Sequence, residues 1–207
     1  SSDLPLYHQA FTVVTRDVAQ DELVKKGHQF GMLEANEQRA MLADILKALN
    51  IQQDRLQVHT YHGEELIERF CGFDINIAFV TGAHPNTTVR QLNTLCAGKP
   101  ISIVQSLPKN FFQKNRYFYQ ITIPKEYYWR VDEDIETLSF RYLLAVNNRI
   151  DSEVLDELMD NFIKELKYNP GFPITESSIL LNYENLQTPL HDVGNELMEG
   201  LQETFAE

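Results

Sequence analysis

Residues 73–88 read FDINIAFVTGAHPNTT. The first eight are a mainly apolar run with several β-branched or aromatic side chains, which is typical of a buried strand that ends near Gly82. Pro85 suits the first turn of a helix, and we expect that helix to run to about Leu95. A buried strand followed directly by a helix is the unit from which α/β sheets are built.

Strands and helices alternate on both sides of this stretch. We expect further strands at residues 10–15, 28–31, 57–61, 101–104, 119–123 and 138–146. Apolar residues at helical spacing predict helices over about 39–49, with Asn50 as C-cap, and from 151–152 to about 166, with shorter ones at 64–70, 176–181 and 193–205. The pattern predicts an α/β fold with largely parallel strands, in which a ligand binds at the carboxyl ends of the strands.

Two segments far apart in the chain resemble each other. Residues 11–17 and 144–151 are both apolar strands that end in a segment with Arg and Asp. We interpret the pair as the two crossings of a chain that leaves one sheet, builds a second lobe and returns.

The charge of the protein argues against nucleic acid as a partner. The formal net charge is −12 over 207 residues, whereas phosphate binding needs a positive surface. Residues 151–207 are the acidic part, which we interpret as a solvated surface, with a docking face for a basic partner as the alternative. No apolar run is long enough for a membrane helix, and the first residues show no signal peptide, which leaves a cytosolic and a trimmed secreted protein both open.

Few residues suggest chemistry. No known catalytic motif is present, so no enzyme and no cofactor are predicted. Cys71 and Cys96 are expected to be buried thiols, with one disulfide as the alternative. His59 and His62, followed by acids, are expected to be ordinary histidines, with a metal site as the alternative, and the acidic run 132–134 a solvated loop rather than a cation site.

The best candidate for a binding site is residues 81–88. Backbone N–H groups at a helix start could hold a carboxylate, Gly82 permits close approach, and His84 and Asn86 offer polar side chains. The alternative is ordinary capping, in which Thr81, Asn86 or Thr87 satisfies the start of the helix.

Three stretches make the chain resemble the TAXI-type solute receptors of TRAP transporters. Residues 76–86 resemble the family's DAAFxxAGxPN segment. Residues 122–134, with Tyr128 inside, resemble TIPAGTYPGQDED, and residues 188–194 resemble PLHPGA. The strand 143–146 and the helix 154–166 are similar to the family's returning strand and helix.

The resemblance implies a periplasmic or otherwise extracytoplasmic receptor of the type II periplasmic-binding-protein fold. Residues 1–20 would be the crossover strand of a partial first lobe, 21–136 the second lobe, and 137–207 the returning strand and C-terminal helices. The solute would be a small organic acid or amino acid that carries a carboxylate. Gly82, His84 and Asn86 would hold its polar end and Tyr128 would cover its apolar part. A membrane transporter subunit would be the protein partner.

Three departures from the family pattern lead to an alternative function. Most of the N-terminal lobe is missing, residues 32–37 read MLEANE where the family has a glycine-rich GSGT loop, and Asn76 replaces an Asp. Glu34 and Glu37 would repel a carboxylate. The alternative is therefore a degenerate receptor domain that acts as a sensor or protein-interaction module on a membrane protein.

Overall fold

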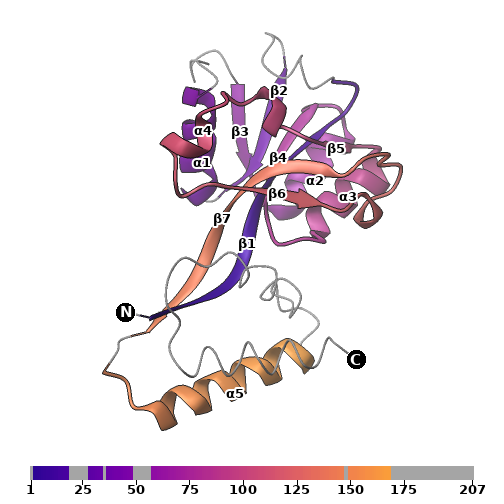
Figure 1. The fold of residues 1–207 in the computed structure, drawn as a ribbon. Coiled ribbons are helices and arrows are strands. Elements are labelled where there is room, and N and C mark those ends of the chain that lie inside the picture. Colours follow the sequence, from indigo (N-terminus) through magenta and orange to yellow (C-terminus); the bar gives the residue numbers. More distant parts are fainter. Residues whose placement is uncertain (1, 19–27, 35, 49–56, 147–148, 169–207) are drawn as a thin grey trace. The chain divides into compact units, whose positions relative to one another are not determined.

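The structure, a computed structural model, describes residues 2–18, 28–34, 36–48, 57–146 and 149–168 (Figure 1). The expected C-cap at Asn50, the expected helices at 176–181 and 193–205, and the segment 188–194 lie outside the described residues. In the part of the chain that is described, no helix has both the length and the apolar character needed to cross a membrane.

Most of the expected elements are confirmed. The strands are β1 (Ser2–Thr15), β2 (Gln29–Leu33), β3 (Gln57–Tyr61), β4 (Ile77–Gly82), β5 (Lys99–Ile101), β6 (Tyr119–Ile123) and β7 (Ile135–Val146). The α-helices are α1 (Asn36–Ala48), α2 (Gly63–Cys71), α3 (Thr87–Cys96), α4 (Phe111–Lys114) and α5 (Ser152–Tyr168). The short helix α4 and two 3₁₀ turns, η3 (Val104–Ser106) and η4 (Lys125–Tyr127), were not expected, and the strand expected at 101–104 lies earlier, as β5.

The described strands form one sheet in the order β3-β2-β4-β1-β7-β6, and β5 also pairs with β1. Strands β3, β2 and β4 are parallel, but β1 is antiparallel to β4 and β5, and β6 is antiparallel to β7. The expectation of a largely parallel sheet is therefore wrong: the sheet is mixed. The residue pattern misses this because a buried strand is apolar whichever way its neighbour runs.

The two segments compared in the sequence, β1 and β7, lie next to each other in this sheet. The sheet contains both strands, and a boundary between two compact units falls within each of them, after Gln9 in β1 and after Phe140 in β7. The α/β class of the fold is confirmed: strands alternate with helices along the described chain, and the long strand β7 is followed by the helix α5.

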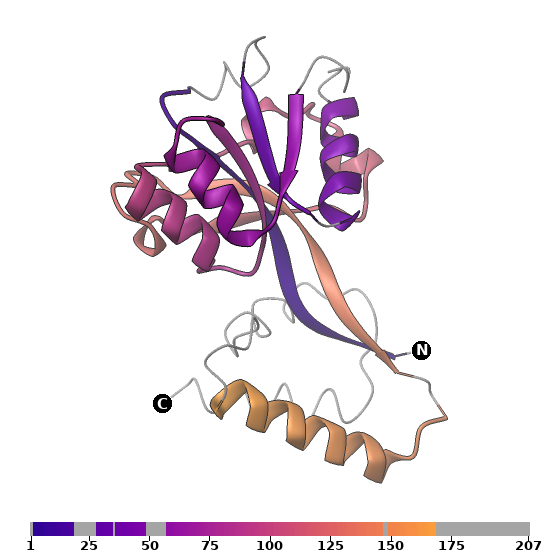
Figure 2. The same cartoon turned by 180° about the vertical axis from the view of Figure 1, so that it is seen from behind.

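Helices cover both faces of the sheet, with a hydrophobic core on each (Figure 2). Alternate residues of a strand point to opposite faces. In β1, Phe11 and Val13 therefore join the core under α1, whereas Ala10 and Val14 join the core under α2 and α3. The candidate binding residues lie at the edge of this second core.

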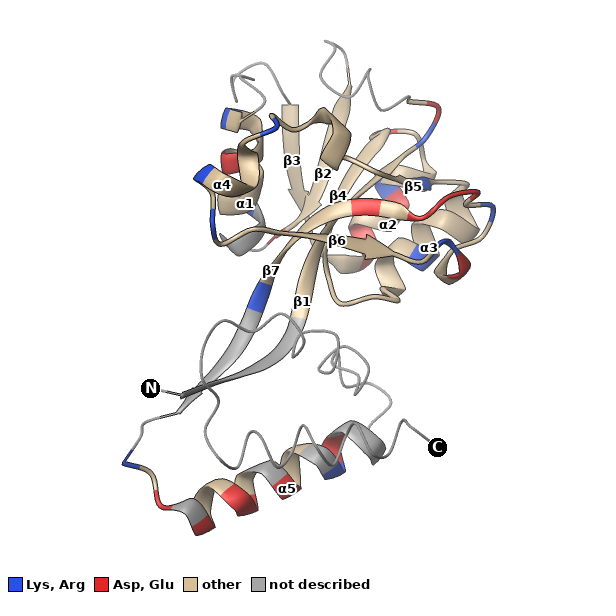
Figure 3. Ribbon diagram, viewed as in Figure 1, with Lys and Arg blue, Asp and Glu red and all other residues tan. Residues whose placement is uncertain are grey.

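The described chain divides into two compact units. One is Ala10–Phe140, and the other combines the residues before Ala10 with those from Arg141 onward. In the second unit, α5 buries Leu155 but leaves Val154 and Leu158 exposed, although the sequence places all three on one apolar face. Figure 3 colours the acidic positions of this helix red. They include Glu153, Asp156, Glu157, Asp160 and Glu165.

Strand β4 begins later than the sequence predicts: the apolar run starts at Phe73, whereas the strand starts at Ile77. Phe73 has a φ of 66°, in the left-handed region, and belongs to the turn that follows α2. Asn76 uses its side chain to bind the start of β2: Oδ1 accepts from Gln29 N at 3.0 Å, and Nδ2 lies 3.0 Å from His28 Nδ1. The main chain of Asn76 donates to Gln29 O at 3.1 Å and accepts from Arg16 N at 3.0 Å, and the regular strand begins only at Ile77.

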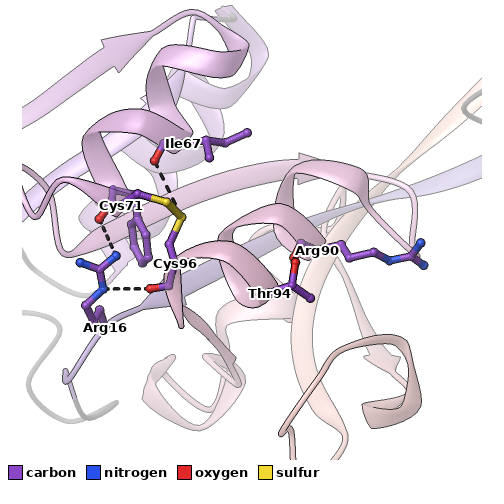
Figure 4. The surroundings of a disulfide bond; sticks show 7 residues. Arg16, Ile67, Cys71, Arg90, Thr94 and Cys96 are labelled. Carbon is purple, nitrogen blue, oxygen red and sulfur yellow. Dashed lines mark hydrogen bonds between the residues drawn. A yellow bond between two sulfur atoms is a disulfide. The ribbon is translucent and has the colours of Figure 1, made fainter.

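Cys71 and Cys96 form a disulfide, so the expectation of free thiols is wrong and the alternative holds. They are the last residues of α2 and α3, with Cα atoms 4.7 Å apart. Arg16 reaches both helix ends from the end of β1, donating to Phe70 O at 2.6 Å and to Cys96 O at 3.1 Å (Figure 4). A cation is favourable at a helix C-terminus, so Arg16 and the disulfide hold the same two ends.

Replacing Gly31 by Ala is expected to lower the free energy of unfolding by about 2 kcal/mol. A Cβ on Gly31 would lie 2.2 Å from Ile75 Cδ1 and 2.8 Å from Leu66 Cδ1, so these two fully buried side chains would have to shift within a packed core. Urea unfolding followed by circular dichroism measures the loss. The matched control is Gly63→Ala, because a Cβ there meets nothing within 4 Å. Equal stability of Gly31→Ala and Gly63→Ala would contradict this packing argument.

Candidate functional site

The carboxyl ends of β3, β2 and β4 lie at one edge of the sheet because the three strands are parallel. Each strand is followed closely by the start of a helix: β2 by α1, β3 by α2 and β4 by α3. Helix N-termini carry a partial positive charge and unpaired N–H groups. This edge is therefore the part of the lobe best suited to a negatively charged or hydrogen-bond-accepting group.

Asn86 is the N-cap of α3. Its Oδ1 accepts from Val89 N at 3.1 Å, and its carbonyl accepts from Arg90 N at 2.9 Å. The capping interpretation is thus confirmed for Asn86. Pro85 lies before the cap, in a cis peptide bond with His84, and not in the first turn as expected. The helix starts at Thr87 because the Asn86 side chain satisfies the N–H group three residues on.

The amide nitrogen of the same side chain lies directly over Gly82. A Cβ on Gly82 would be 2.3 Å from Asn86 Nδ2, so only glycine leaves room for this arrangement. Among the described residues, Asn86 hydrogen-bonds through Oδ1 and its main chain, while Nδ2 has no acceptor. Gly82 and Asn86 together thus present a hydrogen-bond donor at the start of a helix.

His84 and Tyr128 form a hydrogen-bonded chain with Thr12. His84 Nδ1 lies 2.5 Å from the Tyr128 hydroxyl oxygen, and His84 Nε2 lies 2.8 Å from Thr12 Oγ1. Asn86 N donates to the same Tyr128 oxygen at 2.9 Å. The four predicted residues, Gly82, His84, Asn86 and Tyr128, are therefore brought together, and both ring nitrogens of His84 already contact protein groups.

His84 and Tyr128 are both uncharged at neutral pH. Desolvation lowers the pKa of His84 to about 4, because the protonated ring is poorly solvated here. Desolvation also raises the pKa of Tyr128 to about 12, against smaller opposing effects of the Asn86 N–H and of Arg90. Neither side chain supplies a charge to a ligand.

The segment that carries Tyr128 is fixed along α3. The buried side chain of Asn93 clamps Trp129: its Nδ2 donates to Trp129 O at 3.0 Å, and its Oδ1 accepts from Trp129 N at 2.7 Å. Farther along, Lys99 pairs with Asp132 at 3.2 Å and Lys125 N donates to Asp134 Oδ1. The acidic run 132–134 is exposed, which confirms the solvated-loop interpretation.

Glu34 lies at the same sheet edge, at the end of β2. Its Oε2 is 3.4 Å from Nε2 of His62, which directly follows β3, and both side chains are largely exposed. The Glu37 side chain lies outside the described residues. In the part of the chain that the structure describes, no group of His, Cys, Asp and Glu is arranged to hold a metal ion.

The sequence analysis missed Thr12 and Asn93. Thr12 was interpreted only as a strand residue, and its partner His84 lies 72 positions away. Asn93 is a buried polar residue in an amphipathic helix, which is the one local signal that could have drawn attention to it.

Comparisons with known proteins give the following matches. Residues 21–191 match the NMT1-like family, whereas no curated protein matches. One similar solved structure is the arginine-, lysine-, histidine-binding protein ArtJ of Geobacillus stearothermophilus, with a TM-score of 0.36 and 12% identity over 81% of this chain and 58% of that one. Another is the zinc-bound ligand-binding component of an ABC-type import system from Staphylococcus aureus, with a TM-score of 0.40 and 13% identity. This second match covers 98% of this chain and 60% of the other protein's chain.

Proposed function

This chain belongs to the NMT1-like family, and we propose that it is a solute-binding module that holds the carboxylate of a small organic acid or amino acid. It binds its solute without transforming it. It works outside the cytoplasm with a membrane transporter subunit, in a system of the TRAP type with a TAXI-type receptor. The resemblance of residues 76–86 and 122–134 to those receptors supports this finer assignment.

The observation that carries the proposal is the position of the Asn86 amide group. Asn86 Nδ2 lies over Gly82, at the N-terminus of α3 and at the carboxyl end of β4. A carboxylate there would accept from Nδ2 and would be favoured by the partial charge of the helix. Gly82 and Asn86 contact the solute directly, whereas His84 and Tyr128 support them.

A thermal-shift screen of the full chain with succinate and other dicarboxylates, and with amino acids, tests the proposal. A solute present at about 100 times its Kd is expected to stabilise the protein by about 2.7 kcal/mol, and calorimetry then measures the affinity. If no dicarboxylate and no amino acid stabilises the protein at millimolar concentration, the proposal fails.

Asn86→Asp separates binding from helix capping. Asp caps a helix as well as Asn does, so α3 should stay intact. The variant loses the amide donor and places a negative charge against the carboxylate, so affinity should fall at least about tenfold. The matched control is Asn110→Asp, which puts the same charge at the N-cap of α4, where the side chain caps nothing. Equal loss in both variants would speak against Asn86 as the contact.

The Glu34–His62 pair favours the alternative function, a degenerate receptor domain that acts as a sensor or protein-interaction module on a membrane protein. Glu34 places a carboxylate at the sheet edge where the solute's own carboxylate would have to come. Under this alternative, we expect that no solute stabilises the wild-type protein. We also expect that one protein from a membrane extract binds to it saturably. Glu34→Gln separates the two functions: if the solute binds, removing the charge raises its affinity.

A further inference from the structure

We infer that Thr12, His84 and Tyr128 are positioning residues, a relay that couples strand β1 to the start of α3 and so sets where the Asn86 amide group lies. The coupling itself is a statement about the fold. Its consequence for solute affinity rests on the proposed function.

The first step is the position of Thr12. Thr12 is fully buried in the middle of the sheet, opposite Val80 of β4. Its strand is shared by the two compact units, since β1 starts at Ser2 and the unit boundary follows Gln9. A shift of β1 along its own axis therefore moves the hydroxyl that contacts His84.

The second step is the direction of the hydrogen bonds. The Tyr128 oxygen accepts from Asn86 N, so its own proton needs an acceptor, and His84 Nδ1 is the atom within reach. The neutral ring then carries its proton on Nε2 and donates it to Thr12 Oγ1. This order pairs the Tyr128 hydroxyl proton and leaves the Thr12 hydroxyl proton as the one for which the described residues show no acceptor; the reverse order would leave the Tyr128 proton instead.

The third step is the link to the helix. Tyr128 holds the main-chain N–H of Asn86, while the Asn93 clamp on Trp129 fixes the loop that carries Tyr128. The Asn86 side chain then caps α3. Displacing Thr12 therefore acts on Asn86 through two side chains, without any contact between Thr12 and Asn86.

Amide hydrogen exchange of the ligand-free full chain tests the coupling. The measured quantity is the exchange rate of Asn86 N–H divided by that of Leu92, a buried residue of the same helix. Tyr128→Phe removes the acceptor and should raise this ratio about tenfold. Thr12→Val, which removes only the distant hydroxyl, should raise it about threefold, and Thr12→Ser should restore the wild-type ratio.

Thr15→Val is the matched control. Thr15 is also a buried threonine of β1, but its hydroxyl donates to Val18 O and takes no part in the relay. The ratio of the Asn86 and Leu92 exchange rates in Thr15→Val should equal that of wild type. In the Tyr128→Phe background, Thr12→Val should add nothing, because the relay is already broken. Equal effects of Thr12→Val and Thr15→Val, or additive effects with Tyr128→Phe, would overturn the inference.

Two further measurements complete the test. The ¹⁵N spectrum of the His84 ring should show Nε2 protonated, and a ring protonated on Nδ1 would refute the relay order. In the binding experiment, calorimetry should show that Thr12→Val weakens the affinity for succinate about threefold, whereas Thr15→Val leaves this affinity unchanged. If the exchange experiment shows coupling but no solute binds, the relay is retained and the proposed function is rejected. If a solute binds but the exchange experiment shows no coupling, the proposed function is retained and the relay is rejected.

Discussion

Replacing both cysteines, Cys71→Ala with Cys96→Ala, is expected to lower the free energy of unfolding by about 3 kcal/mol. The disulfide closes a loop over a sequence separation of 25, and opening that loop gives the unfolded chain more conformational freedom. This is the largest effect that we expect from a covalent change in the protein. Urea unfolding followed by the fluorescence of Trp129, the only tryptophan of the chain, measures it.

Reduction provides the control for this prediction. A dithiol added to wild type should lower stability to the level of the double alanine variant, and should leave that variant unchanged. Arg16 should limit the loss of structure, because its hydrogen bonds to Phe70 O and Cys96 O do not depend on the disulfide. The folded variant should therefore keep the far-ultraviolet circular dichroism of wild type. If the variant is as stable as wild type, the disulfide is no determinant of the fold.

Acidification is expected to destabilise the protein by about 3 kcal/mol through His84 alone. Burial lowers the pKa of His84 to about 4 in the folded state, against 6.5 for the ordinary side chain. Between these two values the unfolded chain binds a proton that the folded chain does not. Stability is therefore retained above pH 6.5 and lost as the pH falls towards 4, below which no further loss comes from this group.

The comparison of wild type with His84→Gln isolates this effect. The variant has no group at this position that binds a proton in this range. Its loss of stability between pH 6.5 and 4 should therefore be about 3 kcal/mol smaller than that of wild type. Its absolute stability at pH 7 does not matter, because only the pH dependence is compared. His8, whose pKa burial and Arg141 also lower to about 4, contributes equally to both proteins. Parallel pH profiles would show that His84 is not held neutral by burial.

Local sequence was sufficient for most elements. The apolar spacing of Met41, Leu42, Ile45 and Leu46 predicts α1, and each of these side chains is buried. Short runs with β-branched residues likewise predicted β3 and β6, and residues 28–31 were expected to form the short strand that is β2. Errors came at the ends of elements: Phe73 is in a turn although it belongs to an apolar run, because hydrogen bonds to the end of α2 compete with strand pairing.

The candidate site was predictable only where it is local. Gly82 and Asn86 stand four positions apart, so a strand that ends before a helix brings them together by itself. Tyr128 came from the resemblance, which predicts a direct ligand contact, whereas our proposal gives it the role of holding the Asn86 main chain. Thr12 could not be found, because nothing in residues 10–15 distinguishes a threonine that bonds a distant histidine from one that merely fills a strand.

Patterns within a few residues were enough to predict most of the described helices and strands and the Asn86 cap of α3, because these depend on near neighbours in the chain. The direction of β1 in the sheet, the pairing of Cys71 with Cys96 and the partners of His84 emerge only from the three-dimensional packing. Each of these depends on atoms that are far apart along the chain, and their approach is set by how the two cores pack, which no local pattern records.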